Sequence, residues 1–165
     1  MITKLSPNKK SRRGTKITHI VLHCPEGSYA GTIDWFMQSR SNASAHYVVS
    51  KKGEVTQMVK DEDEAWHVLD ANPFCLGIEM EDGFYTRLGQ GKTELTRTCK
   101  NDPGWCTDIQ LKTVAGICKD LMVKFNIPKE NIIGHNNPFL KQYRNNHTDP
   151  EKYFPWTKFR ALLDA

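Results

Sequence analysis

Near its C-terminal end, the chain carries a histidine and an aspartate two positions apart, in the segment His147-Thr148-Asp149-Pro150. Pro150 disfavours a helical conformation for Asp149 and favours an extended one. In an extended chain, alternate residues point to the same side and stand about 6 to 7 Å apart along the backbone. One member of the pair can therefore bind a metal while the other reaches a substrate beside it. Taken alone, the same pattern is common in ordinary polar loops.

Two histidines elsewhere in the chain could complete a metal site with Asp149. His23 and His135 each follow a short apolar segment, and functional groups of open α/β sheets gather beyond strand ends. Two imidazoles and one carboxylate suit Zn²⁺ and leave a fourth position open. Zinc in such a site activates water and polarises a carbonyl, as amide hydrolysis near neutral pH requires. The alternative for His23 is a hydrogen-bonded core residue. His19 shares its strand face but lies about 13 Å away, so we expect it to be structural or at the surface.

Glu79 is the candidate general base. Glu79 and Glu81 fall on one face of an expected strand at 75–81. A carboxylate beside a metal site can accept a proton from an attacking water. The alternative is that both carboxylates belong to a solvated face of the sheet.

The elements that must position these residues alternate between strands and helices. We expect strands at 16–23, 45–50, 54–59, 75–81 and 131–134, helices at 32–40, 107–125 and 155–163, and a long loop at 83–106. Thr32 is the expected cap of the first helix. Thr107 and Gln110 fit a capping box, followed by apolar residues at helical spacing. This order predicts a single α/β domain with a central mixed β-sheet flanked by helices.

The first 15 residues are basic and polar, with Lys9, Lys10, Arg12 and Arg13, and they lack the apolar stretch of a signal peptide. We expect a flexible, solvated segment at 1–15, followed by the folded domain at 16–165, in a chain made in the cytoplasm. The basic cluster could also touch nucleic acid, anionic lipid or cell-wall phosphate, although the net charge of +4 is mild. No segment approaches the roughly 18 apolar residues of a membrane span.

The five cysteines have no closely paired spacing, which argues against a disulfide framework or a zinc ribbon. Cys99 and Cys106 bracket a segment with glycine and proline and could pair if the protein is oxidised, which the sequence leaves open.

Six short motifs occur in an order that resembles the zinc N-acetylmuramoyl-L-alanine amidases. This family includes phage lysozyme-like amidases, bacterial autolysins and peptidoglycan recognition proteins, and the resemblance runs from about Lys16 to Phe159. The motifs are Ile20-Val21-Leu22-His23-Cys24, Ser44-Ala45-His46-Tyr47-Val48-Val49, Ala65-Trp66-His67, Gly77-Ile78-Glu79-Met80-Glu81, Ile132-Ile133-Gly134-His135 and Thr148-Asp149-Pro150.

The resemblance implies a ligand set and a catalytic pair. His23, His135 and Asp149 match the zinc ligands of the family, although many phage members have a cysteine in place of Asp149. Glu79 matches the glutamate that orients or deprotonates the attacking water. His147 stands where many members have lysine, and its implied role is to stabilise the oxyanion as an imidazolium.

Three further residues match positions that usually shape the substrate groove of the family. These residues are His46, Trp66 and His67, and the alternative for each is a structural role. Some phage members place a tyrosine immediately before the histidine that corresponds to His46, whereas this sequence has Ala45.

The implied activity is cleavage of the amide between the lactyl group of N-acetylmuramic acid and the L-alanine of the peptidoglycan stem peptide. We expect a phage endolysin that acts on the host cell wall, with peptidoglycan as its partner, no nucleic-acid partner and a monomeric state. The alternatives are a non-catalytic peptidoglycan-binding module and a cytosolic amidase that recycles anhydro-muropeptides.

Overall fold

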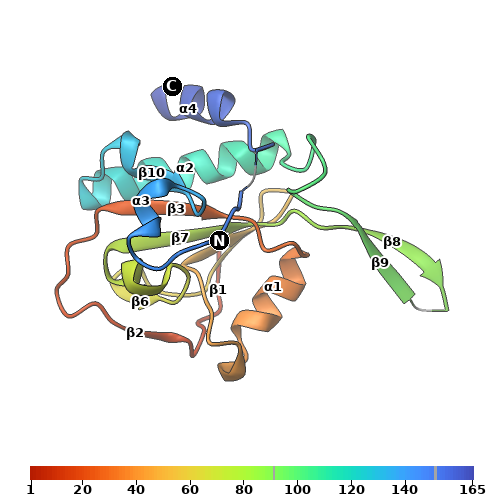
Figure 1. The fold of residues 1–165 in the computed structure, drawn as a ribbon, viewed down its shortest axis with the longest axis horizontal. Coiled ribbons are helices and arrows are strands. Elements are labelled where there is room, and N and C mark those ends of the chain that lie inside the picture. Colours follow the sequence, from red (N-terminus) through yellow and green to blue (C-terminus); the bar gives the residue numbers. More distant parts are fainter. Residues whose placement is uncertain (91, 151) are drawn as a thin grey trace.

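A mixed sheet of six strands, in the order β1-β5-β4-β7-β3-β10, forms the centre of the molecule (Figure 1). The computed structural model describes residues 1–90, 92–150 and 152–165. The strands of this sheet are β1 (Ile2–Thr3), β3 (His19–His23), β4 (Tyr47–Val49), β5 (Val55–Gln57), β7 (Cys75–Met80) and β10 (Ile132–Gly134). β3 pairs in parallel with β7 and β10, and β4 pairs in parallel with β7 and antiparallel with β5. The expected central mixed sheet is confirmed.

Alternate residues of the central strands pack on opposite faces of the sheet. Ile20 and Leu22 of β3 belong to the core beneath α2 (Asp108–Phe125) and α4 (Trp156–Asp164). Val21 points to the other face, where it packs with Leu140 of α3 (Pro138–Lys141). α1 (Tyr29–Phe36) packs against Val48 of β4. Figure 1 shows α2 and α4 on one side of the sheet and α1 on the other.

Helices α1 and α2 both begin at side-chain caps. Thr107 accepts a hydrogen bond from the backbone N–H of Gln110, as the sequence predicts for α2. The prediction for α1 is wrong, because Ser28 and not Thr32 is the cap. Ser28 accepts the N–H of Gly31, and the Thr32 hydroxyl donates to the Ser28 carbonyl from inside the helix. The remaining helical segments are short 3₁₀ turns at Ser39–Ser41, Leu69–Phe74 and Lys129–Asn131.

The segment expected to be a long loop contains a β-hairpin. β8 (Phe84–Gly89) pairs antiparallel with β9 (Lys92–Arg97), and Figure 1 shows this hairpin extending away from the rest of the molecule. The aromatic, threonine and leucine residues of the two strands favour extended structure. In the sequence, Gly83, Gly89 and Gly91 interrupt the pattern, so periodicity alone predicts a loop.

The N-terminal segment is not the flexible tail that its composition suggests. β1 pairs in parallel with β5, and β2 (Lys9–Ser11) pairs antiparallel with β6 (Asp63–Ala65). Arg12 is only 4% exposed. Its guanidinium donates to four backbone carbonyls, those of Asp61, Asn72, Pro73 and Cys75. Basic side chains here make specific contacts to the body of the protein, so the segment is part of the fold.

The Cys99–Cys106 pair that the sequence left open does not form. Cys99 forms a disulfide with Cys24, and Cys106 is a free thiol. The bond joins the residue after β3 to the residues that follow the β8–β9 hairpin, two places that only the tertiary fold brings together. Within the described residues, no helix is both long and apolar enough to cross a bilayer.

Candidate metal and catalytic site

Three adjacent parallel strands bring their functional residues to one edge of the sheet. His23 ends β3 and pairs in register with Glu79 of β7. His135 follows β10, whose last residue, Gly134, pairs with Leu22. Because the carboxyl ends of parallel strands meet at one edge, these side chains lie together on the face opposite α2.

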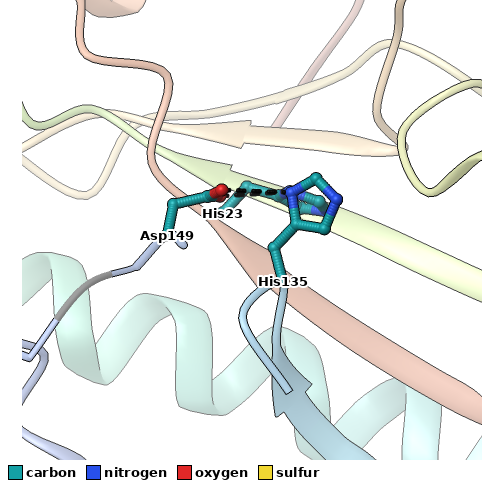
Figure 2. Close-up of side chains that lie close together, drawn as sticks. All are labelled: His23, His135 and Asp149. Atoms are coloured by element: carbon teal, nitrogen blue, oxygen red, sulfur yellow. Dashed lines mark hydrogen bonds and ion pairs between the residues drawn. The ribbon is translucent and has the colours of Figure 1, made fainter. Parts of the chain in front are cut away.

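His23, His135 and Asp149 point their ligand atoms at one another (Figure 2). The Nδ1 atoms of the two histidines are 3.0 Å apart. Asp149 Oδ1 lies 3.1 Å from His135 Nδ1, and Asp149 Oδ2 lies 3.4 Å from His23 Nδ1. A tetrahedral metal with ligand bonds of about 2.0 to 2.1 Å has ligand atoms roughly 3.3 Å apart. The three side chains therefore fit Zn²⁺ and leave a fourth position free.

The protonation states of this cluster also suit a metal. Burial alone raises the pKa of Asp149, but hydrogen bonds and charge interactions with His135 and His23 outweigh it and hold that pKa well below its usual range. Burial, followed by the charge of His23, lowers the pKa of His135. A carboxylate and a neutral imidazole are the forms that bind metals.

Backbone contacts hold Asp149 in place. Its Oδ2 accepts the N–H of Cys24, and its carbonyl accepts the N–H of Asn136. The peptide bond from Asp149 to Pro150 is cis. These contacts tie the C-terminal loop to the ends of β3 and β10, so the third candidate ligand is positioned by the same strand ends as the first two.

His147 lies over the cluster and outside it. Its ring stacks on that of His135 with centroids 4.1 Å apart, and its Nδ1 is 3.8 Å from Asp149 Oδ1. The His147 side chain is 63% exposed, whereas that of Asp149 is 16% exposed. Partial burial, followed by the charge of His135, lowers the pKa of His147. This direction favours the neutral imidazole near pH 7, so the residue would act as an N–H donor more readily than as the expected imidazolium.

Glu79 and Glu81 have different surroundings. The Glu79 carboxyl is buried, and its Oε2 has no hydrogen-bond partner among the described residues. Burial, followed by the charges of Asp149 and Asp82, raises the pKa of Glu79 well above the usual range. Glu81 instead accepts the backbone N–H groups of Tyr29 and Lys51. Glu79 therefore has an unpartnered oxygen and a raised affinity for a proton, while Glu81 holds two loops.

A cavity of about 440 Å³ opens over the cluster. Glu79, His147 and Trp66 line it together with the three candidate ligands. A neighbouring cavity of about 360 Å³ shares Glu79 and Phe36 with it and is walled by Trp35 and Tyr85. Another of about 450 Å³ adjoins on the side of Trp66, where Lys10 and Glu64 contribute charged groups. Because the two neighbouring cavities each share wall residues with the cavity over the cluster, we treat the three as one groove that includes the candidate metal site.

The residues expected to line the groove behave differently from one another. Trp66 and His67 do line the cavity. The expected substrate contact of His46 is wrong for this structure, because His46 is fully buried. Its Nδ1 accepts the backbone N–H of Gly77, its Nε2 lies 3.1 Å from the Asp63 carbonyl, and burial with the nearby Arg12 lowers its pKa to about 3.

Sequence reasoning missed several groups around the site. Trp35 and Tyr85 are large aromatic residues about half exposed at the groove. Tyr85 lies in the hairpin that was expected to be a loop, so its position could not be inferred. Trp35 stands one residue before the buried Phe36 in α1, and an exposed tryptophan on an amphipathic helix is the signal that could have identified it.

Comparisons with known proteins agree with this architecture. The sequence profile of the family described as N-acetylmuramoyl-L-alanine amidase matches residues 13–152. N-acetylmuramoyl-L-alanine amidase A of Achromobacter lyticus is 27% identical over 162 residues, covering 97% of this chain and 90% of the relative. The 1,6-anhydro-N-acetylmuramyl-L-alanine amidase AmpD of Salmonella typhimurium is 28% identical over 151 residues, covering 82% of this chain and 68% of the relative.

A crystal structure of a selenomethionine derivative of AmpD has the same fold. Its TM-score is 0.72 at 24% sequence identity, and the match covers 98% of this chain and 93% of that one. The family profile spans most of the chain, and the two relatives align along 97% and 82% of it. The protein therefore belongs to the N-acetylmuramoyl-L-alanine amidase family of enzymes.

Proposed function

We propose that the protein hydrolyses the amide between N-acetylmuramic acid and L-alanine in peptidoglycan, with Zn²⁺ held by His23, His135 and Asp149. The observation that carries this proposal is the convergence of two imidazole nitrogens and a carboxylate at 3.0 to 3.4 Å, beside a buried carboxyl group in an open groove. A non-catalytic binding module would not require a complete donor set next to a proton acceptor.

Zn²⁺ bound to these residues would polarise the substrate carbonyl and make water more acidic. Glu79 accepts a proton from the water whose oxygen attacks the carbonyl carbon. His147 donates an N–H to the oxygen that gains negative charge in the tetrahedral intermediate. Glu79 then returns the proton to the leaving nitrogen as the carbon–nitrogen bond breaks. The products are a lactyl carboxylate on the sugar and a free amino group on L-alanine.

The length of the groove supports a polymeric substrate. The cavity walled by Trp35 and Tyr85 and the cavity beside Lys10 each share wall residues with the cavity over the catalytic centre, and they share none with each other. A scissile amide between a sugar and a peptide needs room on both sides. We therefore propose that Trp66 contacts the substrate and that the protein acts on intact cell wall as an endolysin, as a monomer with peptidoglycan as its partner.

A recycling amidase is the second candidate function. It is favoured by the similarity to AmpD of Salmonella typhimurium, whose name describes an amidase for 1,6-anhydro-muropeptides. Such an enzyme would share the metal set and the catalytic pair. It would differ in preferring small soluble substrates over the polymer.

One experiment tests both the reaction and the substrate. The purified protein is analysed for zinc, then incubated separately with intact sacculi and with soluble anhydro-muropeptides, and the products are identified by mass spectrometry. About one zinc per chain and released peptides with N-terminal L-alanine support the proposed reaction. Faster turnover of sacculi supports the endolysin, and activity confined to soluble muropeptides supports the recycling enzyme. Full activity in metal-free protein would overturn the zinc assignment.

A further inference from the structure

His67 lies on the side of His23 that faces away from the other candidate ligands. Its Nδ1 is 2.9 Å from His23 Nε2, and the two rings meet edge to face with centroids 5.0 Å apart. The other ring nitrogen of His23, Nδ1, faces His135 and Asp149. His23 therefore has one nitrogen in the metal cluster and the other against His67.

The hydrogen-bond roles of this pair follow from what a metal requires. A metal binds the lone pair of a neutral imidazole nitrogen, so Nδ1 of His23 must be unprotonated and its Nε2 must carry the proton. The Nε2–H of His23 then donates to Nδ1 of His67. The reverse arrangement, in which His67 donates, would place the His23 proton on Nδ1 and block the metal.

We propose that His67 is a positioning residue, which holds His23 in the tautomer and ring orientation that present Nδ1 to the metal. Partners of this kind, bound to the second nitrogen of a metal-binding histidine, fix its tautomer and tune metal affinity. The proposal rests on the proposed function for the identity of the metal. It replaces the interpretation of His67 as a residue that only lines the substrate groove.

The backbone is shaped to accept this ring. A Cβ atom on Gly77 would lie 2.7 Å from His67 Nδ1 and 2.9 Å from its Cε1 and Cγ, which is closer than real Cβ contacts. Any side chain at this position of β7 would therefore displace the imidazole from His23. The backbone N–H of His67 also donates to Asn72 Oδ1 at 2.9 Å, which fixes the residue from the other direction.

Packing alone does not account for a histidine at this place. In the tautomer that accepts from His23, the proton of His67 is on Nε2, and that atom is buried with no hydrogen-bond partner among the described residues. An unpartnered buried N–H destabilises the folded state. A leucine would fill similar space without that penalty, so the polar ring is explained by its contact with His23.

Four variants separate positioning from packing. His67→Leu keeps bulk and removes the acceptor, while His67→Asn places an amide oxygen near the position of Nδ1. Gly77→Ala keeps the imidazole but pushes it away from His23. His19→Leu is the matched control, because it removes a histidine of β3, the strand that also carries His23. The His19 ring stacks on Phe139, with ring centroids 4.4 Å apart, away from the cluster.

The first measurement is zinc affinity, by competition with a chromophoric chelator. We expect His67→Leu and Gly77→Ala to bind zinc about 10- to 100-fold more weakly, the usual effect of losing a partner of a metal-binding histidine. His67→Asn should recover most of the wild-type affinity, and His19→Leu should equal wild type. Wild-type affinity in both His67→Leu and Gly77→Ala would overturn the proposal.

The second measurement is ¹⁵N NMR of the imidazoles in the wild-type protein, with and without zinc. We expect the His23 proton on Nε2, with a nitrogen–nitrogen coupling across the hydrogen bond to Nδ1 of His67. A proton on Nδ1 of His23, or no coupling between the rings, would overturn the proposal even where a variant fails to fold. Absence of zinc binding and of hydrolysis in the wild type would instead refute the proposed function, while the coupling still reports on the pair.

Discussion

Replacing Arg12 with methionine tests whether the N-terminal segment is part of the fold. Methionine keeps much of the length of the side chain and removes the guanidinium. In the wild type, this group donates to the carbonyls of Asp61, Asn72, Pro73 and Cys75 at 3.1, 3.0, 2.6 and 2.8 Å. The substitution leaves these four acceptors without their donor in a place that water reaches poorly.

The expected loss of stability follows from two opposing effects. A buried acceptor that loses its partner costs about 1 to 3 kcal/mol, so four of them set a ceiling near 12 kcal/mol. Burial lowers the pKa of Arg12 despite nearby carboxylates, which shows that holding the charge in this place is itself unfavourable. Relief of that desolvation recovers several kcal/mol. We expect a net loss of about 3 to 5 kcal/mol, a large part of the roughly 5 to 15 kcal/mol that stabilises a domain.

The assay is urea unfolding followed by tryptophan fluorescence, with chelator present so that metal binding does not contribute. The neighbouring Arg13 is the matched control, because its side chain is exposed. Arg13→Met should change the free energy of unfolding by no more than about 0.5 kcal/mol. Equal stability of the two variants would show that the segment behaves as a solvated tail, and the reasoning from buried hydrogen bonds would be refuted.

Three further predictions concern the site and the disulfide. Glu79→Gln should lower turnover by about 10² to 10⁴ through loss of the base, with unchanged zinc content by elemental analysis; turnover near wild type would exclude this role. Asp149→Ala should deplete zinc, whereas His147→Ala should keep it and lose turnover; the opposite zinc contents would mean that ligand and catalyst are exchanged. Reduction of the Cys24–Cys99 bond, which spans 75 residues, should lower the free energy of unfolding by up to about 4.5 kcal/mol in thermal melts. A Cys99→Ser variant should not respond to reductant.

The features that the sequence predicted correctly are those set by local pattern. The cap at Thr107 and the apolar spacing behind it define α2, because capping and amphipathic periodicity act within a few residues. The shared position of His23 and His135 at one sheet edge follows from each standing at the end of a strand. Parallel pairing then brings the two together without further information.

The features that escaped prediction depend on contacts between distant parts of the chain. Arg12 looks like one of several basic tail residues until the carbonyls that accept its hydrogen bonds are known. Cys99 lies close to Cys106 in sequence, but the hairpin before it brings it to Cys24. His46 belongs to a motif whose histidine was expected to line the groove. Only its hydrogen bond from the Gly77 backbone N–H shows that the side chain faces inward.

The same contacts connect the N-terminal segment to the proposed metal site. Arg12 Nη2 lies 2.8 Å from His46 Nε2, and the opposite nitrogen of His46 accepts the N–H of Gly77. Gly77 in turn leaves the space in which His67 contacts His23. A series of contacts between buried groups thus links Arg12 to His23, a candidate zinc ligand. The position of each group depends on that of its neighbour. A metal that binds only the folded state also stabilises that state. Residues such as Arg12 and His46, which position His67 against His23, therefore contribute both to the stability of the fold and to metal binding.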